Sequence, residues 1–213
     1  MPYEKPDTDE LLRRAGEADD AAVGALLERR RVRLRHMVAV RIDPRLAARI
    51  DPSDVVQEAL TEAYLKLPSY LQKRPIPFYP WLRQIAWERL LHLHWQHVHA
   101  QKRSVTREDG GYLPLPDESA MRLVDGLISQ EISPSRRVAC EEIRERVRAA
   151  LEQLPPHYRE VVILRHLERL TFEETAGVLG VSEAATRSRY RRAVERLHKR
   201  LSGDGLENAD DRS

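Results

Sequence analysis

The stretch TFEETAGVLGVSEAATRSRYRRAVERLHKRL, residues 171–201, predicts two helices joined by a short turn. Thr171 and Glu174 have the spacing of a capping box, in which each side chain accepts a hydrogen bond from the backbone N–H of the other residue. Gly180 follows the first helix, where a turn needs a positive φ, and Ser182 can cap the second helix. This arrangement is typical of the DNA-binding helix-turn-helix.

The two helices are expected at 172–179 and 183–201. The second has apolar residues spaced by four, three and four positions, which predicts a buried stripe of Tyr190, Val194, Leu197 and Leu201. Seven basic residues and one acid lie between 187 and 200. Arginines near the start of such a helix can bind guanine edges, and the others can bind phosphates. The candidate DNA contacts are Thr186, Arg187, Ser188, Arg191 and Arg192. The alternative interpretation is a solvated basic face on an ordinary bundle helix.

The rest of the chain predicts an all-α protein made of two small helical domains. Glycine is scarce, with 9 in 213 residues, and Leu, Arg, Ala and Glu dominate. Residues 104–135 carry turn signals and little periodicity, so we expect a flexible linker there. The expected organisation is therefore a helical domain at 1–103, the linker, a second domain at 136–201 and an acidic disordered tail at 202–213.

Helical periodicity divides the first domain further. It predicts two helices between residues 7 and 42, a third at 51–67 and a long one from about Phe78 to Ala100. Ser53 is the expected cap of the third helix, and Val56, Leu60, Ala63, Tyr64 and Leu67 form its expected apolar stripe.

The third helix carries a polar patch at DVVQE, residues 54–58. Asp54, Gln57 and Glu58 share one side of the helix because they are three and four residues apart. An exposed patch of two acids and an amide can dock a basic helix of a partner protein. The alternative is that the acids only offset the helix dipole.

The stretch WERLLHLHWQHVHAQKR, residues 87–103, carries an aromatic and basic surface. Trp81, His92, Trp95 and His99 are expected on one exposed face, next to Gln96, Lys102 and Arg103. No two of these histidines are four residues apart and no cysteine accompanies them, so the spacing does not favour a metal site. The face suits unstacked bases and phosphates, because bases stack on aromatic side chains.

Composition excludes several classes of protein. Cys140 is the single cysteine, which fits a reducing cytoplasm, and no apolar run approaches a membrane span. The formal net charge of +2 excludes a uniformly basic protein. With no phosphate-binding glycine loop and no nucleophile–base arrangement, we expect neither an enzyme nor a cofactor.

These motifs together resemble the extracytoplasmic-function (ECF) sigma factors of bacterial RNA polymerase, from about residue 10 to 201. LLRRAGEADDAAVGALLERRRVRLRHMV is similar to the start of their conserved region 2. DPSDVVQEAL is similar to their core-polymerase-binding segment, and FYPWLRQIAWERL to their promoter-melting helix. The segment that begins at LPPHYREVVILRHL and runs through the helix-turn-helix is similar to conserved region 4.

The resemblance implies a role for each surface. Asp54, Gln57 and Glu58 would bind the β′ clamp helices of core RNA polymerase, and region 4 would meet the β flap. The −35 element would be read by the candidate DNA contacts of the helix-turn-helix, and the linker would thread toward the active-site and RNA-exit channels. The −10 element would be captured and held open by Lys73, Arg74, Phe78, Trp81, His92, Trp95, Gln96, Lys102 and Arg103.

The resemblance also admits an anti-sigma factor as a partner. Three other functions compete with promoter-directed initiation. A stand-alone repressor or activator would use only the helix-turn-helix, and would need neither the docking patch nor the aromatic helix. A sigma-like decoy would sequester an anti-sigma factor, and would not need a basic recognition helix. A histidine-dependent metalloenzyme would need a better ligand spacing.

Overall fold

The computed structural model describes residues 7–43, 49–98, 115–128 and 139–201. All regular structure in these ranges is helical, which confirms the all-α prediction. The chain divides into two compact units, Met1–Leu113 and Pro114–Ser213. The linker and tail expected at 104–135 and 202–213 lie largely outside the described residues.

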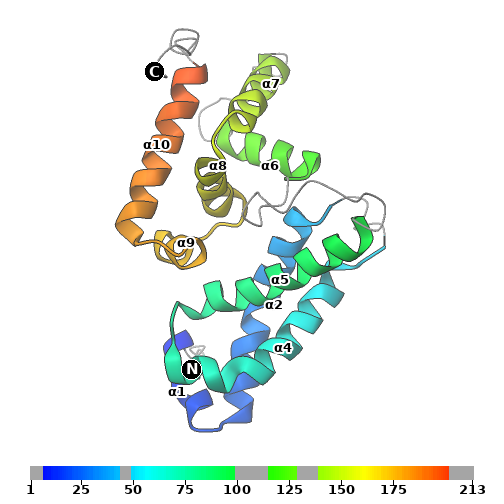
Figure 1. Ribbon diagram of the computed structural model, residues 1–213, viewed down its shortest axis with the longest axis vertical. Coiled ribbons are helices and arrows are strands. Elements are labelled where there is room, and N and C mark those ends of the chain that lie inside the picture. Colours follow the sequence, from blue (N-terminus) through cyan, green and yellow to red (C-terminus); the bar gives the residue numbers. More distant parts are fainter. Residues whose placement is uncertain (1–6, 44–48, 99–114, 129–138, 202–213) are drawn as a thin grey trace, which may run out of the picture. The chain divides into compact units, whose positions relative to one another are not determined.

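The first unit contains α1 (Thr8–Gly16), α2 (Asp20–Arg41), α4 (Pro52–Lys73) and α5 (Phe78–Val98). α4 packs against both α2 and α5, and α1 packs against α2 (Figure 1). The core between them is built from fully buried aliphatic side chains on three helices, among them Leu34, Met37, Ala63, Leu82 and Leu90. This packing fixes which faces of α4 and α5 remain at the surface.

The start of α4 differs from the sequence prediction. Asp51, and not Ser53, caps the helix, because its carboxylate accepts a hydrogen bond of 2.7 Å from the backbone N–H of Ser53. Pro52 then occupies the first turn, where its missing N–H costs nothing. Tyr64, predicted to be buried, is 51% exposed, because the core stripe of α4 continues through Leu67 and Tyr70 instead.

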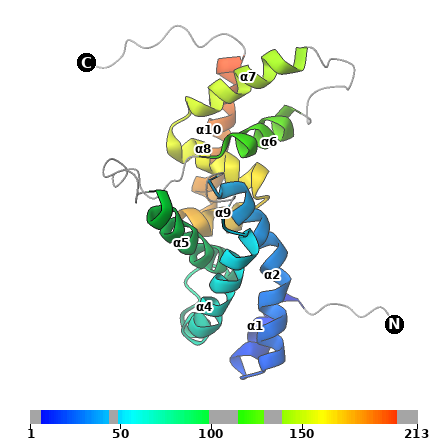
Figure 2. The same cartoon turned by 90° about the vertical axis from the view of Figure 1, so that its right-hand side faces the viewer.

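The second unit contains a helix that the sequence prediction missed. α6 (Asp117–Ile128) lies inside the segment expected to be a linker, and it packs against α7 (Ala139–Glu152) (Figure 2). Leu123 and Val124 are fully buried there. Asp117 and Asp125 pair with Arg148 and Arg144 of α7, at 3.0 and 2.8 Å respectively. The prediction of an irregular segment across 104–135 is therefore wrong for α6.

The remaining elements of the second unit follow α7 closely. α8 (Pro156–Val162) continues into η1 (Ile163–Leu167), a turn of π-helix, and α9 (Phe172–Leu179) and α10 (Glu183–Leu201) come next. α10 packs against α7, α8 and α9, whereas α6 also contacts η1. The buried face of α10 consists of Thr186, Ala193 and Leu197, with Tyr190 half-buried. Val194, predicted in the buried stripe, is 42% exposed.

Candidate nucleic-acid interface and docking patch

The turn between α9 and α10 has the capping that the sequence predicted. Thr171 Oγ1 accepts a hydrogen bond of 3.1 Å from the N–H of Glu174, and Glu174 Oε2 accepts one of 2.9 Å from the N–H of Thr171. Gly180 has a φ of 64°, a left-handed conformation that suits glycine. Ser182 Oγ accepts a bond of 3.2 Å from the N–H of Ala185. Short helix, glycine turn and capped second helix together form a helix-turn-helix.

The start of α10 presents three of the five predicted DNA contacts as exposed basic side chains. Arg187, Arg191 and Arg192 are exposed, and Ser188 is partly exposed. Arg187 forms an ion pair of 2.5 Å with Glu183, and Arg191 lies 3.6 Å from Glu195. These exposed pairs are weak enough for a phosphate or a guanine edge to compete for the guanidinium groups.

Thr186 does not fit the predicted role as a DNA contact. Its side chain is fully buried, and its hydroxyl donates a hydrogen bond of 3.1 Å to the carbonyl of Ser182. Thr186 therefore belongs to the core of the helix-turn-helix, where the hydroxyl is satisfied by the preceding turn. The spacing of α10 carried the signal for this burial, because Thr186 lies four residues before Tyr190 and continues the predicted buried stripe.

The contacts around two aromatic side chains, Phe172 and Tyr190, were not predicted from the sequence. The guanidinium carbons of Arg165 and Arg187 lie 4.1 and 4.4 Å from the ring centroid of Phe172. The Tyr190 hydroxyl lies 2.8 Å from Nε2 of His166, and the two rings are stacked. Burial, and then the positive charge of Arg165, lowers the pKa of His166 below its usual value. An aromatic residue directly after the Thr171 cap was the available signal.

The predicted docking patch on α4 is at the surface. Asp54, Gln57 and Glu58 are all exposed. Gln57 Oε1 accepts a hydrogen bond of 2.9 Å from Arg31 of α2, and Glu58 forms an ion pair with Arg89 of α5. All three side chains of the patch are therefore exposed, and arginines of the neighbouring helices hold Gln57 and Glu58 in place.

A hollow borders this patch between α2 and α4. Its volume is about 370 Å³, and Gln57 and the exposed Tyr64 are among its lining residues. Leu27 and Leu60 supply apolar surface at its floor, and Arg31 lies beside Gln57. A partner side chain that inserts here would touch both the apolar floor and the polar patch.

Three aromatic side chains, from the end of α4 and the start of α5, form a cluster. Trp81 stacks on Tyr70 with ring centroids 4.4 Å apart, and Phe78 lies 5.7 Å from each of them. Phe78 is only 4% exposed, so its predicted contact with a base does not fit its buried position. Trp81 is partly exposed, whereas Lys73 and Arg74 are exposed beside the cluster.

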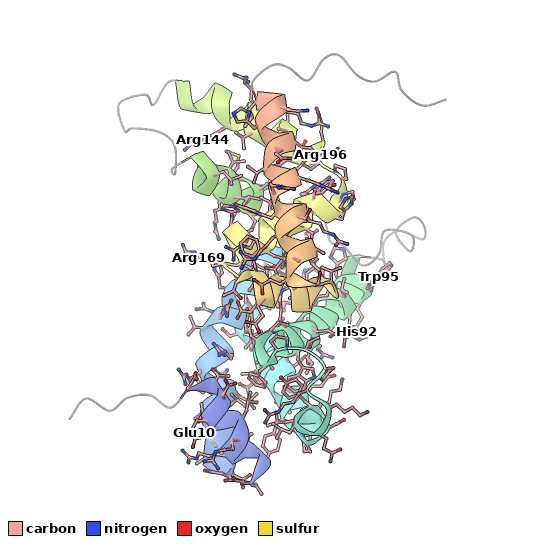
Figure 3. The ribbon with its side chains drawn as sticks, turned by 90° about the vertical axis from the view of Figure 1, so that its left-hand side faces the viewer. Glu10, His92, Trp95, Arg144, Arg169 and Arg196 are labelled. Atoms are coloured by element: carbon pink, nitrogen blue, oxygen red, sulfur yellow. The ribbon has the colours of Figure 1, made fainter. Side chains whose placement is uncertain are left out.

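The C-terminal part of α5 carries the exposed aromatic face. His92 and Trp95 both project from it (Figure 3), and Trp95 is 41% exposed. Nε2 of His92 lies 2.8 Å from the amide nitrogen of Gln96. Lys102 and Arg103 lie outside the described residues. Within the described residues no group of three His, Cys, Asp or Glu side chains could hold a metal ion.

A helix-turn-helix with a basic second helix places the chain among DNA-binding transcription proteins. Residues 144–197 match the family described as Sigma-70, region 4. The chain is 31% identical over 195 residues to the ECF RNA polymerase sigma-E factor of Escherichia coli (strain K12), with 90% of this chain and 92% of the relative covered.

Two further similarities extend the comparison. The ECF RNA polymerase sigma factor SigM of Bacillus subtilis (strain 168) is 29% identical over 145 residues, which cover 68% of this chain and 76% of SigM. The solved structure of CnrH in complex with the cytosolic domain of CnrY aligns with a TM-score of 0.49 at 22% identity. That alignment covers 93% of this chain and 99% of the other.

The chain belongs to the ECF RNA polymerase sigma factors. It directs RNA polymerase to promoters, so that core RNA polymerase and promoter DNA are its partners, and it is not an enzyme. None of the described helices is long and apolar enough to cross a membrane.

Proposed function

We propose that the polymerase-binding surface is centred on Asp54, Gln57 and Glu58 of α4 and that the β′ clamp helices occupy it. The observation that carries this proposal is an exposed patch of acids and amide beside an open hollow. Basic side chains of a partner helix would pair with the acids, while an apolar side chain would enter the hollow beside Tyr64. Such a combination of buried anchor and polar rim is typical of protein interfaces.

The −10 element is the proposed ligand of the exposed part of α5 and of the segment before it. Trp95 offers a ring for a base to stack on, and His92 and Gln96 offer hydrogen-bonding groups on the same face. Lys73 and Arg74 are exposed basic groups that suit phosphates. Trp81 contributes the open part of its ring, and Lys102 and Arg103 continue the basic sequence beyond the described residues. Phe78 is buried and packs against Trp81, so it does not contact a base in this proposal.

The −35 element is the proposed ligand of Arg187, Ser188, Arg191 and Arg192. All four lie in the first part of α10, where a recognition helix enters the major groove. A bidentate arginine–guanine contact discriminates against other bases by about 1–3 kcal/mol. Thr186 is buried beneath this surface and helps to pack the start of α10.

The proposal also includes two further protein partners and a location in the cell. The second unit would meet the β flap of the polymerase, and an anti-sigma factor would regulate the protein by covering the polymerase-binding surface. The protein would act in the cytoplasm, where its polymerase is.

A pull-down of core RNA polymerase tests the docking patch. The triple variant Asp54→Ala, Gln57→Ala, Glu58→Ala is expected to lose binding that the wild type has. The matched control replaces two exposed acids and one exposed amide elsewhere in the first unit, Asp9, Glu17 and Gln72, by alanine. Equal loss in both variants, or in neither, would contradict the proposed surface.

A further inference from the structure

The guanidinium of Arg187 is held against an aromatic ring that belongs to another helix. Its carbon lies 4.4 Å from the centroid of Phe172, the first residue of α9. Glu183 holds the same guanidinium from the α10 side, with its Oε1 accepting bonds from Nη2 at 2.5 Å and from Nε at 3.1 Å. Arg187 is nevertheless exposed. The group that is offered to DNA is therefore fixed at two sides and open at the third.

Two side chains besides Arg187 contact the ring of Phe172. The ring of Tyr190 meets it edge to face with centroids 5.5 Å apart, and Arg165 covers it at 4.1 Å. The capping box of Thr171 and Glu174 spans Phe172 and sets the backbone of this first turn of α9. These contacts restrict the ring of Phe172, so it offers Arg187 a defined surface to pack against.

A second layer supports Tyr190. Its hydroxyl lies 2.8 Å from Nε2 of His166, and the two ring centroids are 5.7 Å apart in a stacked arrangement. His166 belongs to the π-helical turn η1, where the N–H of Glu168 donates a bond of 3.1 Å to the carbonyl of Ile163. π-Helical turns of this kind are rare and occur frequently at functional sites. The contacts therefore run from η1 through Tyr190 and Phe172 to Arg187.

We propose that Phe172 is a positioning residue for promoter recognition, which holds the guanidinium of Arg187 in the orientation that binds a base edge and is itself held by Tyr190 and His166. The proposal rests on the proposed function, in which Arg187 reads the −35 element. An arginine side chain loses considerable rotamer freedom when it is fixed on a ligand. A side chain that is oriented before binding loses less, and this gain applies only to the base pair that the oriented group contacts.

Base preference is the measurement that separates positioning from folding. Holoenzyme reconstituted from the full-length protein and core RNA polymerase transcribes a library of templates that is randomised across the −35 element, and the transcribed templates are sequenced. Phe172→Leu removes the ring but keeps an apolar side chain, whereas Phe172→Tyr keeps the ring. Tyr190→Phe removes only the hydroxyl that meets His166. Arg187→Ala reports the base pairs that Arg187 reads.

The expected result is selective. Phe172→Leu reduces discrimination about two- to fivefold at the base pairs that Arg187→Ala relaxes, which corresponds to the loss of an exposed cation–π contact, and it leaves other positions unchanged. Phe172→Tyr restores the preference of the wild type. Tyr190→Phe has a smaller effect at the same base pairs. Circular dichroism is expected to give the same helix content for all four variants.

Each other outcome overturns the proposal in a distinct way. A uniform loss of transcription in Phe172→Leu with unchanged base preference would mean that Phe172 touches the DNA backbone or only maintains the fold. Preserved preference in Phe172→Leu, with relaxed preference in Arg187→Ala, would reject positioning and leave the proposed function intact. Unchanged preference in Arg187→Ala would reject both. If Phe172→Leu fails to fold, a Tyr190→Phe protein without any change in preference rejects the chain of contacts.

Discussion

Trp81 and Trp95 look alike in the sequence, and the structure separates them. Trp81 stacks on Tyr70 within a cluster that Phe78 completes, whereas 41% of Trp95 is exposed. Replacing Trp81 would therefore disturb the packing of α4 on α5 as well as any contact with DNA. Trp95 is the residue at which the stacking of a base can be tested without this complication.

Trp95→Ala is expected to impair opening of the −10 region more than formation of the closed complex. The physical reason is the loss of base–aromatic stacking, worth about 1–3 kcal/mol per base. Permanganate footprinting of the −10 region measures the opening, and an electrophoretic mobility assay measures the closed complex. Trp95→Phe keeps an aromatic face and is expected to open the promoter nearly as the wild type does. Normal permanganate reactivity in Trp95→Ala would contradict the assignment.

His166 makes the stability of the second unit dependent on pH. Burial lowers its pKa in the folded chain below the usual 6.5, and unfolding restores the usual value. At a pH between the lowered pKa of the folded chain and 6.5, the unfolded chain therefore binds more protons than the folded chain. The contribution of His166 to stability is therefore complete above 6.5 and is lost as the pH falls below it.

The comparison of His166→Gln with the wild type isolates this effect. The drop in Tm between about pH 7.5 and about pH 5.5 is expected to be smaller in His166→Gln, because glutamine does not titrate. The control is His157→Gln, since His157 is exposed in the same unit. Equal drops in the wild type and His166→Gln would show that protonation of His166 is not coupled to unfolding.

Capped helices were the predictable part of the fold. α9 and α10 begin and end at the residues that the caps and the Gly180 turn predicted. The exposure of single residues was less predictable: Thr186 and Phe78 were placed among the DNA contacts, although both are buried. A pattern of polar neighbours tells which residues share a face, but the neighbouring helices decide how that face is turned.

α6 was missed for a different physical reason. Its twelve residues are flanked by turn-forming sequence, which hid the helical spacing of Ala120, Leu123, Val124 and Leu127. An isolated helix of this length is marginal in water. Its stability comes from burial of Leu123 and Val124, with ion pairs from Asp117 and Asp125 to α7. Tertiary contacts of this kind are not visible in local periodicity.

Leu123→Ala tests whether α6 is an integral part of the second unit. Because Leu123 is 2% exposed, its truncation is expected to lower the free energy of unfolding of a 114–201 fragment by about 2–5 kcal/mol. Urea denaturation followed by circular dichroism measures the change. Arg122→Ala, on the exposed face of the same helix, is the control and is expected to stay near the wild type. Similar stability in all three fragments would mean that α6 is dispensable.

The chain has a formal net charge of +2, yet two of its exposed surfaces differ in charge. Acids and an amide form the patch on α4, whereas basic residues crowd the exposed side of α10. The acidic patch is the surface that we propose for core RNA polymerase, and the basic side of α10 is the surface that we propose for the −35 element. The order of the motifs along the chain could be predicted from the sequence, because each motif is local.

The N-terminal boundary of the second unit can be tested with two fragments. A fragment of residues 114–201 is expected to unfold cooperatively and to have a higher Tm than a fragment of 136–201. The shorter fragment lacks α6 and exposes the apolar side chains of α7 and η1 that α6 covers. It should therefore also bind the dye ANS more strongly, as proteins with exposed apolar surface do. A 136–201 fragment as stable as the longer one would contradict the boundary.

The π-helical turn η1 has a consequence for how this molecule can change over evolution. A wide turn holds about one residue more than an α-helical turn, and η1 ends α8 with such a turn, so it sets where His166 lies relative to α8. Loss of one residue within Ile163–Leu167 would restore the ordinary spacing and would bring a different side chain to Tyr190. Promoter preference could thus drift through a change in helix phase, while every residue of the recognition helix stays the same.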